Sequence, residues 1–240
     1  MGRHKFLDKL IYLVTVPKCV CCGKRLAMHE EALCTSCLKS YTEICTRNCS
    51  KCAKPLSECS CSMPYLEAHY IKRLVKVFRY KNREENIAAN SLIYSLKKDN
   101  RSDVLDFCTE ELLSAFSASK IDVSDFIIVN VPRRKSQIVK YGIDHAKLLA
   151  ENIAKRTGAV YMNLLRSNVK TAQKEVYGKE RETNIDFDII RDIDLKGKNV
   201  MIVDDIVTTG SSMGAAAMLL RGLGAKKIIG ATIAIAYKEN

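Results

Sequence analysis

Two adjacent carboxylates stand at the end of an apolar run in the stretch VMIVDDIVTTGSSM. The four residues before them are apolar and mostly β-branched, which is typical of a strand covered on both faces in a parallel sheet. A helix is expected to begin after Gly210, where serines and an alanine-rich run follow. Because ligands of open parallel sheets bind at the carboxyl ends of the strands, Asp204 and Asp205 are expected to face a ligand.

The residues that follow the carboxylates suit a phosphate group. Their turn offers backbone N–H groups, hydroxyls and a helix N-terminus, which together bind anions. Carboxylates would repel a phosphate at close range, but they accept hydrogen bonds from the vicinal hydroxyls of a ribose. The stretch therefore predicts a site for a sugar with a 5′-phosphate. Asp204 and Asp205 are the candidates for the ribose, and the phosphate candidates are Thr208, Thr209, Gly210, Ser211 and Ser212.

Two other interpretations of this stretch explain less. A strand that ends in aspartate also occurs in nucleotide hydrolases, but the chain contains no G-x-x-x-x-G-K-[ST] phosphate loop. Two solvated acids before a capped helix would be the plainest interpretation. It does not explain why acids, threonines, glycine and serines occur together in this order.

Composition bounds the class of protein. With 240 residues, 47% of them hydrophobic, the chain has room for one domain and a smaller module. No apolar run reaches the ~18 residues of a membrane helix, so no membrane insertion is expected. Pro17 and Lys18 stand where an export cleavage site would need small residues, which favours a cytoplasmic location. The net charge of +12 would attract polyanions.

Ten of the 11 cysteines lie between Cys19 and Cys61, and such clustering in a reducing compartment indicates metal binding rather than disulfides. Two Cys-x-x-Cys pairs predict a tetrahedral zinc site, and Gly23 allows a tight turn after the first pair. A second set, less regular because of its Cys-x-Cys spacing, could bind another zinc. The predicted ligands are Cys19, Cys22, Cys34 and Cys37, then Cys49, Cys52, Cys59 and Cys61. All-thiolate sites are closed, so the zinc is expected to be structural; an iron–sulfur cluster is the alternative.

The composition changes after Pro64, which predicts a Cys-rich zinc-binding module over residues 1–66 and a second domain with its own core over 67–240. At the start of the second domain, apolar residues recur at helical spacing with basic residues between them. The segment is predicted to be a helix with a basic face, either simply solvated or bound to DNA. The DNA-binding candidates are Lys72, Arg73, Lys76 and Arg79.

The remainder alternates between apolar runs and amphipathic segments. Strands are predicted over 126–131, 160–164, 200–204 and 227–236, and a helix over 141–155. This alternation predicts an α/β fold with a doubly wound parallel sheet and helices on both faces. The polar segment 165–191 is expected to be a binding loop or lid.

The stretch VMIVDDIVTTGSS resembles the phosphoribosyl pyrophosphate (PRPP) motif of type I phosphoribosyltransferases. Two further stretches, IIVNVPRRKSQIVKYGIDHA and LRSNVKTAQKEVYGKERETNI, together with the cysteine pairs, make the chain similar to the ComF (competence protein F) family over nearly its whole length. The chain departs from the family at two places. Asn130 replaces the first proline of Val-Pro-Val-Pro, and YGIDH (141–145) replaces Arg-Gly-Phe-Asn-Gln.

The resemblance implies a phosphoribosyltransferase-like fold and a DNA-uptake accessory function, with single-stranded DNA and a helicase-like competence protein as partners. It also implies a PRPP or related phosphoribosyl ligand whose own oxygens largely hold Mg²⁺. Arg133 and Arg134 are expected to meet a pyrophosphate group or a nucleic-acid backbone. The alternative is an enzyme that transfers phosphoribose to a nitrogenous base, and a third possibility is a PRPP-sensing site that regulates DNA handling.

Overall fold

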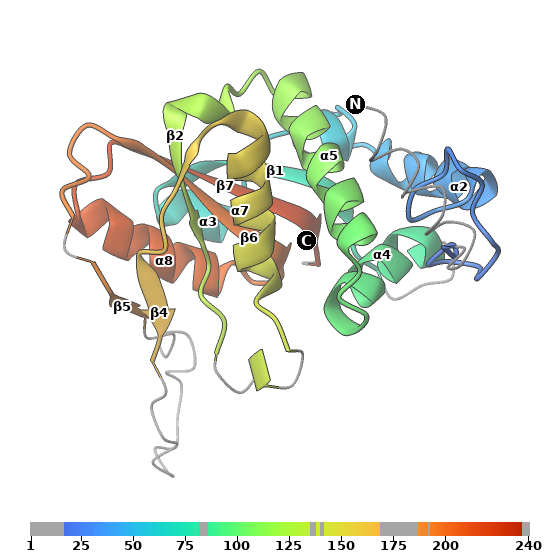
Figure 1. The fold of residues 1–240 in the computed structure, drawn as a ribbon. Helices are drawn as coiled ribbons and strands as arrows, with labels where there is room; N and C mark the ends of the chain where they lie inside the picture. Colours follow the sequence, from blue (N-terminus) through green and yellow to red (C-terminus); the bar gives the residue numbers. More distant parts are fainter. Residues whose placement is uncertain are drawn as a thin grey trace, which may run out of the picture.

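The computed structural model describes residues 17–81, 86–134, 138–139, 142–168, 187–191 and 193–236. A five-stranded parallel sheet with the order β1-β7-β6-β2-β3 lies at its centre (Figure 1). The strands of this sheet are β1 (Ile71–Arg79), β2 (Phe126–Asn130), β3 (Val160–Tyr161), β6 (Asn199–Val207) and β7 (Lys227–Ile235). The short strands β4 (Leu165–Ser167) and β5 (Phe187–Ile189) form a separate antiparallel pair.

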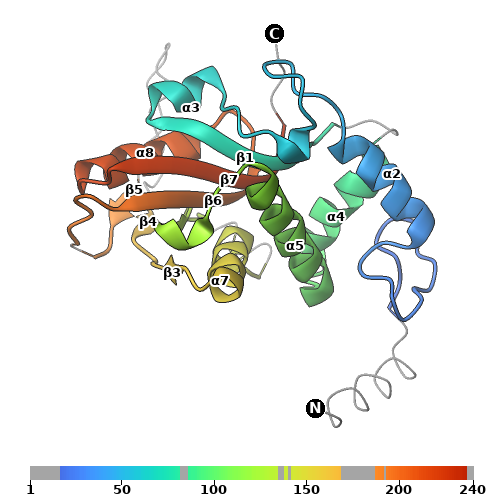
Figure 2. The same cartoon turned by 90° about the horizontal axis from the view of Figure 1, so that it is seen from above.

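Helices cover both faces of the sheet, as the alternation of the sequence predicts. In Figure 2, α4, α5 and α7 lie on one side of the sheet and α3 and α8 on the other. The α-helices are α2 (Thr35–Cys45), α3 (Pro64–Ala68), α4 (Ile87–Lys98), α5 (Ser102–Ala118), α7 (His145–Thr157) and α8 (Ser211–Gly222). The 3₁₀ turns are η1 (Leu56–Glu58) and η3 (Val123–Asp125). Within the described part of the chain, no helix is long and apolar enough to cross a membrane.

Strands β6 and β7 confirm the expectation from continuous apolar runs. In β6, Met201 and Val203 pack into the core beneath α5 and α7, whereas Val200 and Ile202 pack toward α3 and α8. Both faces are buried because successive side chains point to opposite sides of the sheet. The two carboxylates, Asp204 and Asp205, lie within the carboxyl-terminal half of β6.

The predicted helix over 141–155 begins later, at His145. Asp144 caps it, because its carboxylate accepts a hydrogen bond from the backbone N–H of Lys147 at 3.1 Å. Gly142 has a positive φ of 79°, which turns the chain into this cap. The helix ends at Gly158, whose φ of 73° is a common helix stop.

The predicted helix at 71–79 is wrong: this segment is the edge strand β1, paired in parallel with β7. A register shift between Ile71 and Leu74 places three residues of β1 opposite two of β7. That bulge explains the misleading three-residue spacing of apolar side chains, which imitates a helical period. The basic residues of the segment therefore do not share a helical face.

Residues of the Cys-rich segment belong to both of the buried clusters that flank the sheet. Leu26, Leu33 and Ile44 pack in one cluster with β1 and α5. Leu56 and Cys59 pack in the other cluster with α3 and α8. The predicted lid, 165–191, begins with strand β4 and ends close after strand β5. Its middle, 169–186, lies outside the described residues.

Candidate phosphoribosyl site and metal centres

The predicted phosphate loop connects the carboxyl end of β6 to the N-terminus of α8. Gly210 has a φ of 83° and stands at the N-cap of this 12-residue helix, whose first N–H groups have no partner within the helix. The hydroxyls of Thr209 and Ser211 lie 2.7 Å apart and close the turn. A small cavity of about 50 Å³ is lined by Asp204 and by residues 206–213. The loop thus places N–H groups and hydroxyls around a space suited to an anion.

The phosphate loop packs against Met63 and α3, which follow the second cysteine cluster in the sequence. A Cβ atom on Gly210 would lie 3.0 Å from Cγ of Leu66 and 3.2 Å from Sδ of Met63. Glycine is therefore required here both by its positive φ and by this close approach of α3. The sequence offers no signal for this contact, because the two segments are about 145 residues apart.

The two adjacent carboxylates have different surroundings. Asp205 is buried; its Oδ2 accepts a hydrogen bond from the guanidinium of Arg133 at 2.5 Å and forms an ion pair with the ammonium of Lys97 at 3.4 Å. Asp204 is partly exposed and lines the cavity. Loss of solvation, reinforced by the charge of Asp205, raises the pKa of the Asp204 carboxyl well above its usual value. Of the two aspartates, only Asp204 lines the cavity with the phosphate loop.

The guanidinium of Arg133 pairs with Asp205, and Arg133 is not among the residues that line the small cavity. Its guanidinium also donates to Nδ1 of His145 at 2.9 Å, and the Nε2–H of His145 then donates to Oδ1 of Asn100 at 3.0 Å. Burial, followed by the neighbouring Arg133 charge, lowers the pKa of His145 to about 4, so the ring is neutral in this chain of hydrogen bonds. Contact of Arg133 and of the exposed Arg134 with pyrophosphate stays a prediction. Lys97 and Asn100 were not foreseen from the sequence.

We expect His145 to make the protein sensitive to acid. Its folded pKa is depressed, so the unfolded chain takes up the proton first as the pH falls below about 6.5. Stability should fall between about pH 6.5 and pH 4, by up to about 3 kcal/mol. Urea unfolding at a series of pH values measures this loss, which should be smaller in His145→Gln and unchanged in a variant of the exposed His29, His29→Gln. Equal acid sensitivity in all three proteins would contradict it.

A larger cavity of about 520 Å³ lies beside this network, at the carboxyl end of β2. Its apolar lining includes Pro132, Ile143 and Leu165, and Asn163 and Glu151 add polar groups. The volume is in the range of small-molecule sites. The quoted stretches IIVNVPRRKSQIVKYGIDHA and LRSNVKTAQKEVYGKERETNI contribute most of the residues that line this cavity.

The four predicted DNA-binding residues do not form one solvated basic face. Lys72 is exposed, but Arg73 donates to the Oγ of Ser60 at 3.1 Å and is half-buried. Lys76 is only 1% exposed and points into the protein. Arg79 is half-buried on the same strand. The predicted basic helical face is wrong because the segment is a strand, and DNA binding by these four residues stays a prediction.

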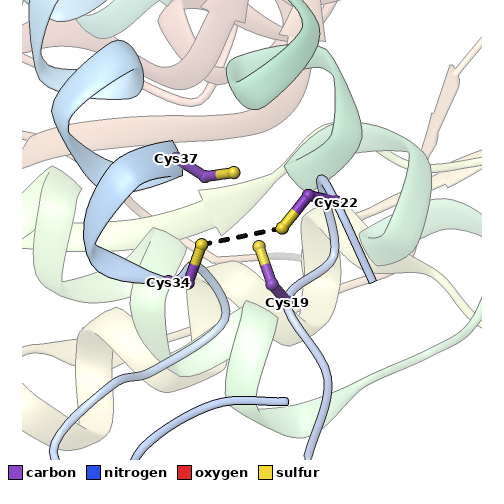
Figure 3. A group of neighbouring side chains, drawn as sticks. All are labelled: Cys19, Cys22, Cys34 and Cys37. Atoms are coloured by element: carbon purple, nitrogen blue, oxygen red, sulfur yellow. Dashed lines mark hydrogen bonds between the residues drawn. The ribbon is translucent and has the colours of Figure 1, made fainter. Parts of the chain in front are cut away.

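The predicted cysteine ligands come together in two groups. Within each group the sulfur atoms all lie within 4.8 Å of one another. Figure 3 shows the first group, where the sulfurs of Cys22 and Cys34 are 3.6 Å apart. In the second, those of Cys52 and Cys59 are 3.4 Å apart. A tetrahedral zinc with Zn–S bonds of about 2.3 Å has sulfur atoms about 3.8 Å apart, so both groups fit such an ion.

The first halves of the two groups are repeats of one knuckle, 30 residues apart. In the first, the N–H of Gly23 donates to the carbonyl of Cys19 at 2.9 Å. In the second, the N–H of Ala53 donates to Cys49 at the same distance. Gly23 and Ala53 both have positive φ, 74° and 57°. The repeat indicates that the two groups serve the same chemistry.

The repeat leads to a stability prediction. Ala53 has a left-handed backbone that costs an L-residue roughly 1–2 kcal/mol relative to the right-handed form. Ala53→Gly should therefore stabilise the protein by up to about 1 kcal/mol, and Gly23→Ala should destabilise it by a similar amount. Both effects are measured by denaturant unfolding. Nothing lies within 4 Å of a Cβ on Gly23, so a change of the same sign in both variants would contradict a backbone effect.

Comparisons with known proteins show similarity to the phosphoribosyl transferase domain and to DNA utilization proteins. Residues 143–239 match the phosphoribosyl transferase domain. The DNA utilization protein YhgH of Salmonella typhimurium is 25% identical over 225 residues, covering 90% of this chain and 96% of that protein, and the Escherichia coli K12 protein of the same name gives the same values. The ribose-phosphate pyrophosphokinase of Thermococcus kodakarensis is 70% identical over 37 residues, 15% of this chain and 13% of that enzyme. A purine phosphoribosyltransferase structure from Pyrococcus horikoshii aligns with 18% identity, 57% and 82% coverage and a TM-score of 0.36.

The parallel sheet and the match over 143–239 define the C-terminal part of the chain as a phosphoribosyltransferase-type domain. Relatives named DNA utilization proteins align over nearly the whole chain at 25% identity, and two cysteine clusters lie in the N-terminal region, so the chain is similar to these proteins. The resemblance predicted from the sequence is thereby confirmed.

Proposed function

We propose that this protein is a DNA-uptake accessory protein of the cytoplasm whose phosphoribosyltransferase-type domain binds PRPP or a related phosphoribosyl ligand. The observation that carries the proposal is the cavity between Asp204 and the loop at the start of α8. The 5′-phosphate would accept hydrogen bonds from the loop's N–H groups and from the hydroxyls of Thr209 and Ser211. Asp204 would accept from a ribose hydroxyl, and the ligand's own oxygens would largely hold Mg²⁺.

Calorimetric titration with PRPP·Mg²⁺ tests this proposal. Gly210→Ala should reduce the affinity at least tenfold, because an alanine strains the backbone and collides with Leu66. Gly222→Ala is the matched control, since it changes the other end of α8, where a Cβ meets nothing within 4 Å. Binding that is the same in both variants, or absent from the unsubstituted protein, would contradict the proposal.

Single-stranded DNA is the proposed polymer ligand, and a helicase-like competence protein the proposed partner. Two observations favour nucleic acid: the net charge of +12 and relatives that are named DNA utilization proteins. Such binding would be electrostatic and largely independent of sequence. A PRPP site in the same chain would allow ligand binding to regulate DNA handling.

The structure refines the expected salt dependence of DNA binding. The logarithm of the binding constant should fall steeply with the logarithm of salt concentration, by about 0.7 per phosphate contact. Lys72→Ala should flatten this slope if Lys72 contacts a phosphate, whereas the buried Lys76 should not contribute to it. Fluorescence anisotropy with labelled oligonucleotides measures the slopes. If the oligonucleotides do not bind even at low salt, the proposal of DNA binding is contradicted.

Phosphoribosyl transfer is the second candidate, and the cavity of about 520 Å³ favours it. An apolar floor from Pro132, Ile143 and Leu165, with an amide at Asn163, suits a flat nitrogenous base. The enzyme would displace pyrophosphate from PRPP with that base. Release of pyrophosphate in the presence of PRPP and a panel of purines and pyrimidines would establish it. No release with any base, from protein that binds PRPP, would leave the accessory function as the better description.

A further inference from the structure

Lys76 is a buried lysine in the middle of strand β1. Lys76 is 1% exposed, and it is among the largest fully buried side chains in the described part of the protein. It follows Leu74 by two residues, so both side chains point to the face of the sheet where α3 and α8 lie. Lysine is almost never buried to this extent unless it has a partner of opposite charge.

The ammonium group of Lys76 contacts the second cysteine group, at Cys59 and Cys61. Its Nζ lies 2.8 Å from the carbonyl oxygen of Cys61 and 3.3 Å from those of Cys59 and Leu74. The fourth acceptor is the sulfur of Cys59, at 3.4 Å. Of these four acceptors only the sulfur can carry a negative charge, and it does so as a thiolate.

The strand geometry explains why the two elements meet. Cys61 forms an antiparallel bridge with Arg73, and the N–H of Leu74 donates to the carbonyl of Ser60 at 3.0 Å. The segment 59–61 therefore extends along the free edge of β1. In an extended segment, residues two apart point to the same side, so the Cys-x-Cys spacing brings both sulfurs to one site.

We propose that Lys76 is the charge-compensating residue of a metal site formed by Cys49, Cys52, Cys59 and Cys61. Four thiolates around a divalent ion carry a net charge of −2, and burial of that charge is costly without a nearby cation. Lys76 reduces the net charge to −1 and donates a hydrogen bond to Cys59, which fixes the position of this ligand. In the first group, the hydroxyl of Ser36 lies 3.3 Å from the sulfur of Cys34. Lys76 thus makes the edge strand of the sheet part of the second metal centre.

Zinc release tests this proposal on the full-length protein. Zinc transfer to a chelating dye should occur in two phases, which Cys22→Ser and Cys52→Ser assign to the first and second sites. Lys76→Met should accelerate the second-site phase at least tenfold, in line with the 10–100-fold effects of residues that hold metal ligands in position. The first-site phase should be unchanged, which also reports that the chain is folded. Lys72→Met is the matched control, because it removes an exposed lysine from the same strand.

Lys76→Gln separates charge from hydrogen bonding, because it keeps a donor without a charge. This variant should also accelerate zinc release from the second site. It replaces Lys76→Met in the experiment if Lys76→Met does not fold. Second-site zinc retained at the unsubstituted rate in either folded variant would overturn the proposal. So would an acceleration of both phases together, which would indicate a general loss of stability.

Discussion

Asp204→Asn and Asp205→Asn should shift the melting temperature in opposite directions, although the two residues are adjacent. Asp205→Asn leaves the guanidinium of Arg133 and the ammonium of Lys97 without their shared counter-charge. Breaking such a buried ion pair costs about 3–5 kcal/mol. In a chain of this length that corresponds to a fall of roughly 10 °C, measurable by calorimetry or circular dichroism.

Asp204→Asn should instead raise the melting temperature and weaken ligand binding. The folded pKa of Asp204 is above its unfolded value, so the stability it contributes at low pH is lost as the pH rises and the carboxyl ionises. Asparagine cannot ionise and avoids this cost at neutral pH. The same change removes the charged acceptor for the ribose, so PRPP affinity should fall at least tenfold, about 1.4 kcal/mol. Shifts of the same sign in the two variants, or unchanged PRPP affinity in Asp204→Asn, would contradict these roles.

Loss of the second metal site should damage the phosphate loop more than loss of the first. Cys61 is followed two residues later by Met63, which together with Leu66 supports Gly210. Cys52→Ser should therefore reduce PRPP affinity at least tenfold, whereas Cys22→Ser should change it only a few-fold. The first site packs on the opposite core, beside α2 and α5. Equal effects of the two variants on affinity would contradict a specific support of the loop.

Metal analysis provides the control for that comparison. The unsubstituted protein should be colourless and contain two zinc ions per chain, and each serine variant should lose one of them. Both variants should unfold at lower temperature, because each site closes a segment that packs in a shared core with the sheet. Brown, iron-loaded protein would contradict the zinc assignment and would indicate that the cysteines bind an iron–sulfur cluster.

The parts of the fold that were predicted correctly have strong local signals. Strands β6 and β7 are continuous apolar runs, and the loop before α8 combines glycine, threonine and serine in one short stretch. Strand β1 was mispredicted because a bulge near its start gives the apolar residues a helical spacing. A local pattern cannot reveal the partner strand β7, which lies more than 150 residues further along the chain.

The residues of the site that escaped prediction act through packing between distant segments. Lys97 and Asn100 reach Asp205 and His145 from the end of α4, and neither has a recognisable motif around it. Lys76 was assigned to a DNA-binding face because its charge is visible in the sequence, whereas its burial depends on the second cysteine group. Charge alone does not distinguish a solvated lysine from one that neutralises a buried anion.

The most direct test of the phosphoribosyl site is an NMR titration of isotopically labelled protein with PRPP·Mg²⁺. Backbone amide signals of residues 208–212 should shift most, because their N–H groups would donate to the 5′-phosphate. Asp204→Asn should retain the shifts from phosphate but weaken binding, since it alters only the contact with the ribose. Amide signals of 208–212 that do not respond at saturating PRPP, while signals elsewhere do, would contradict the site.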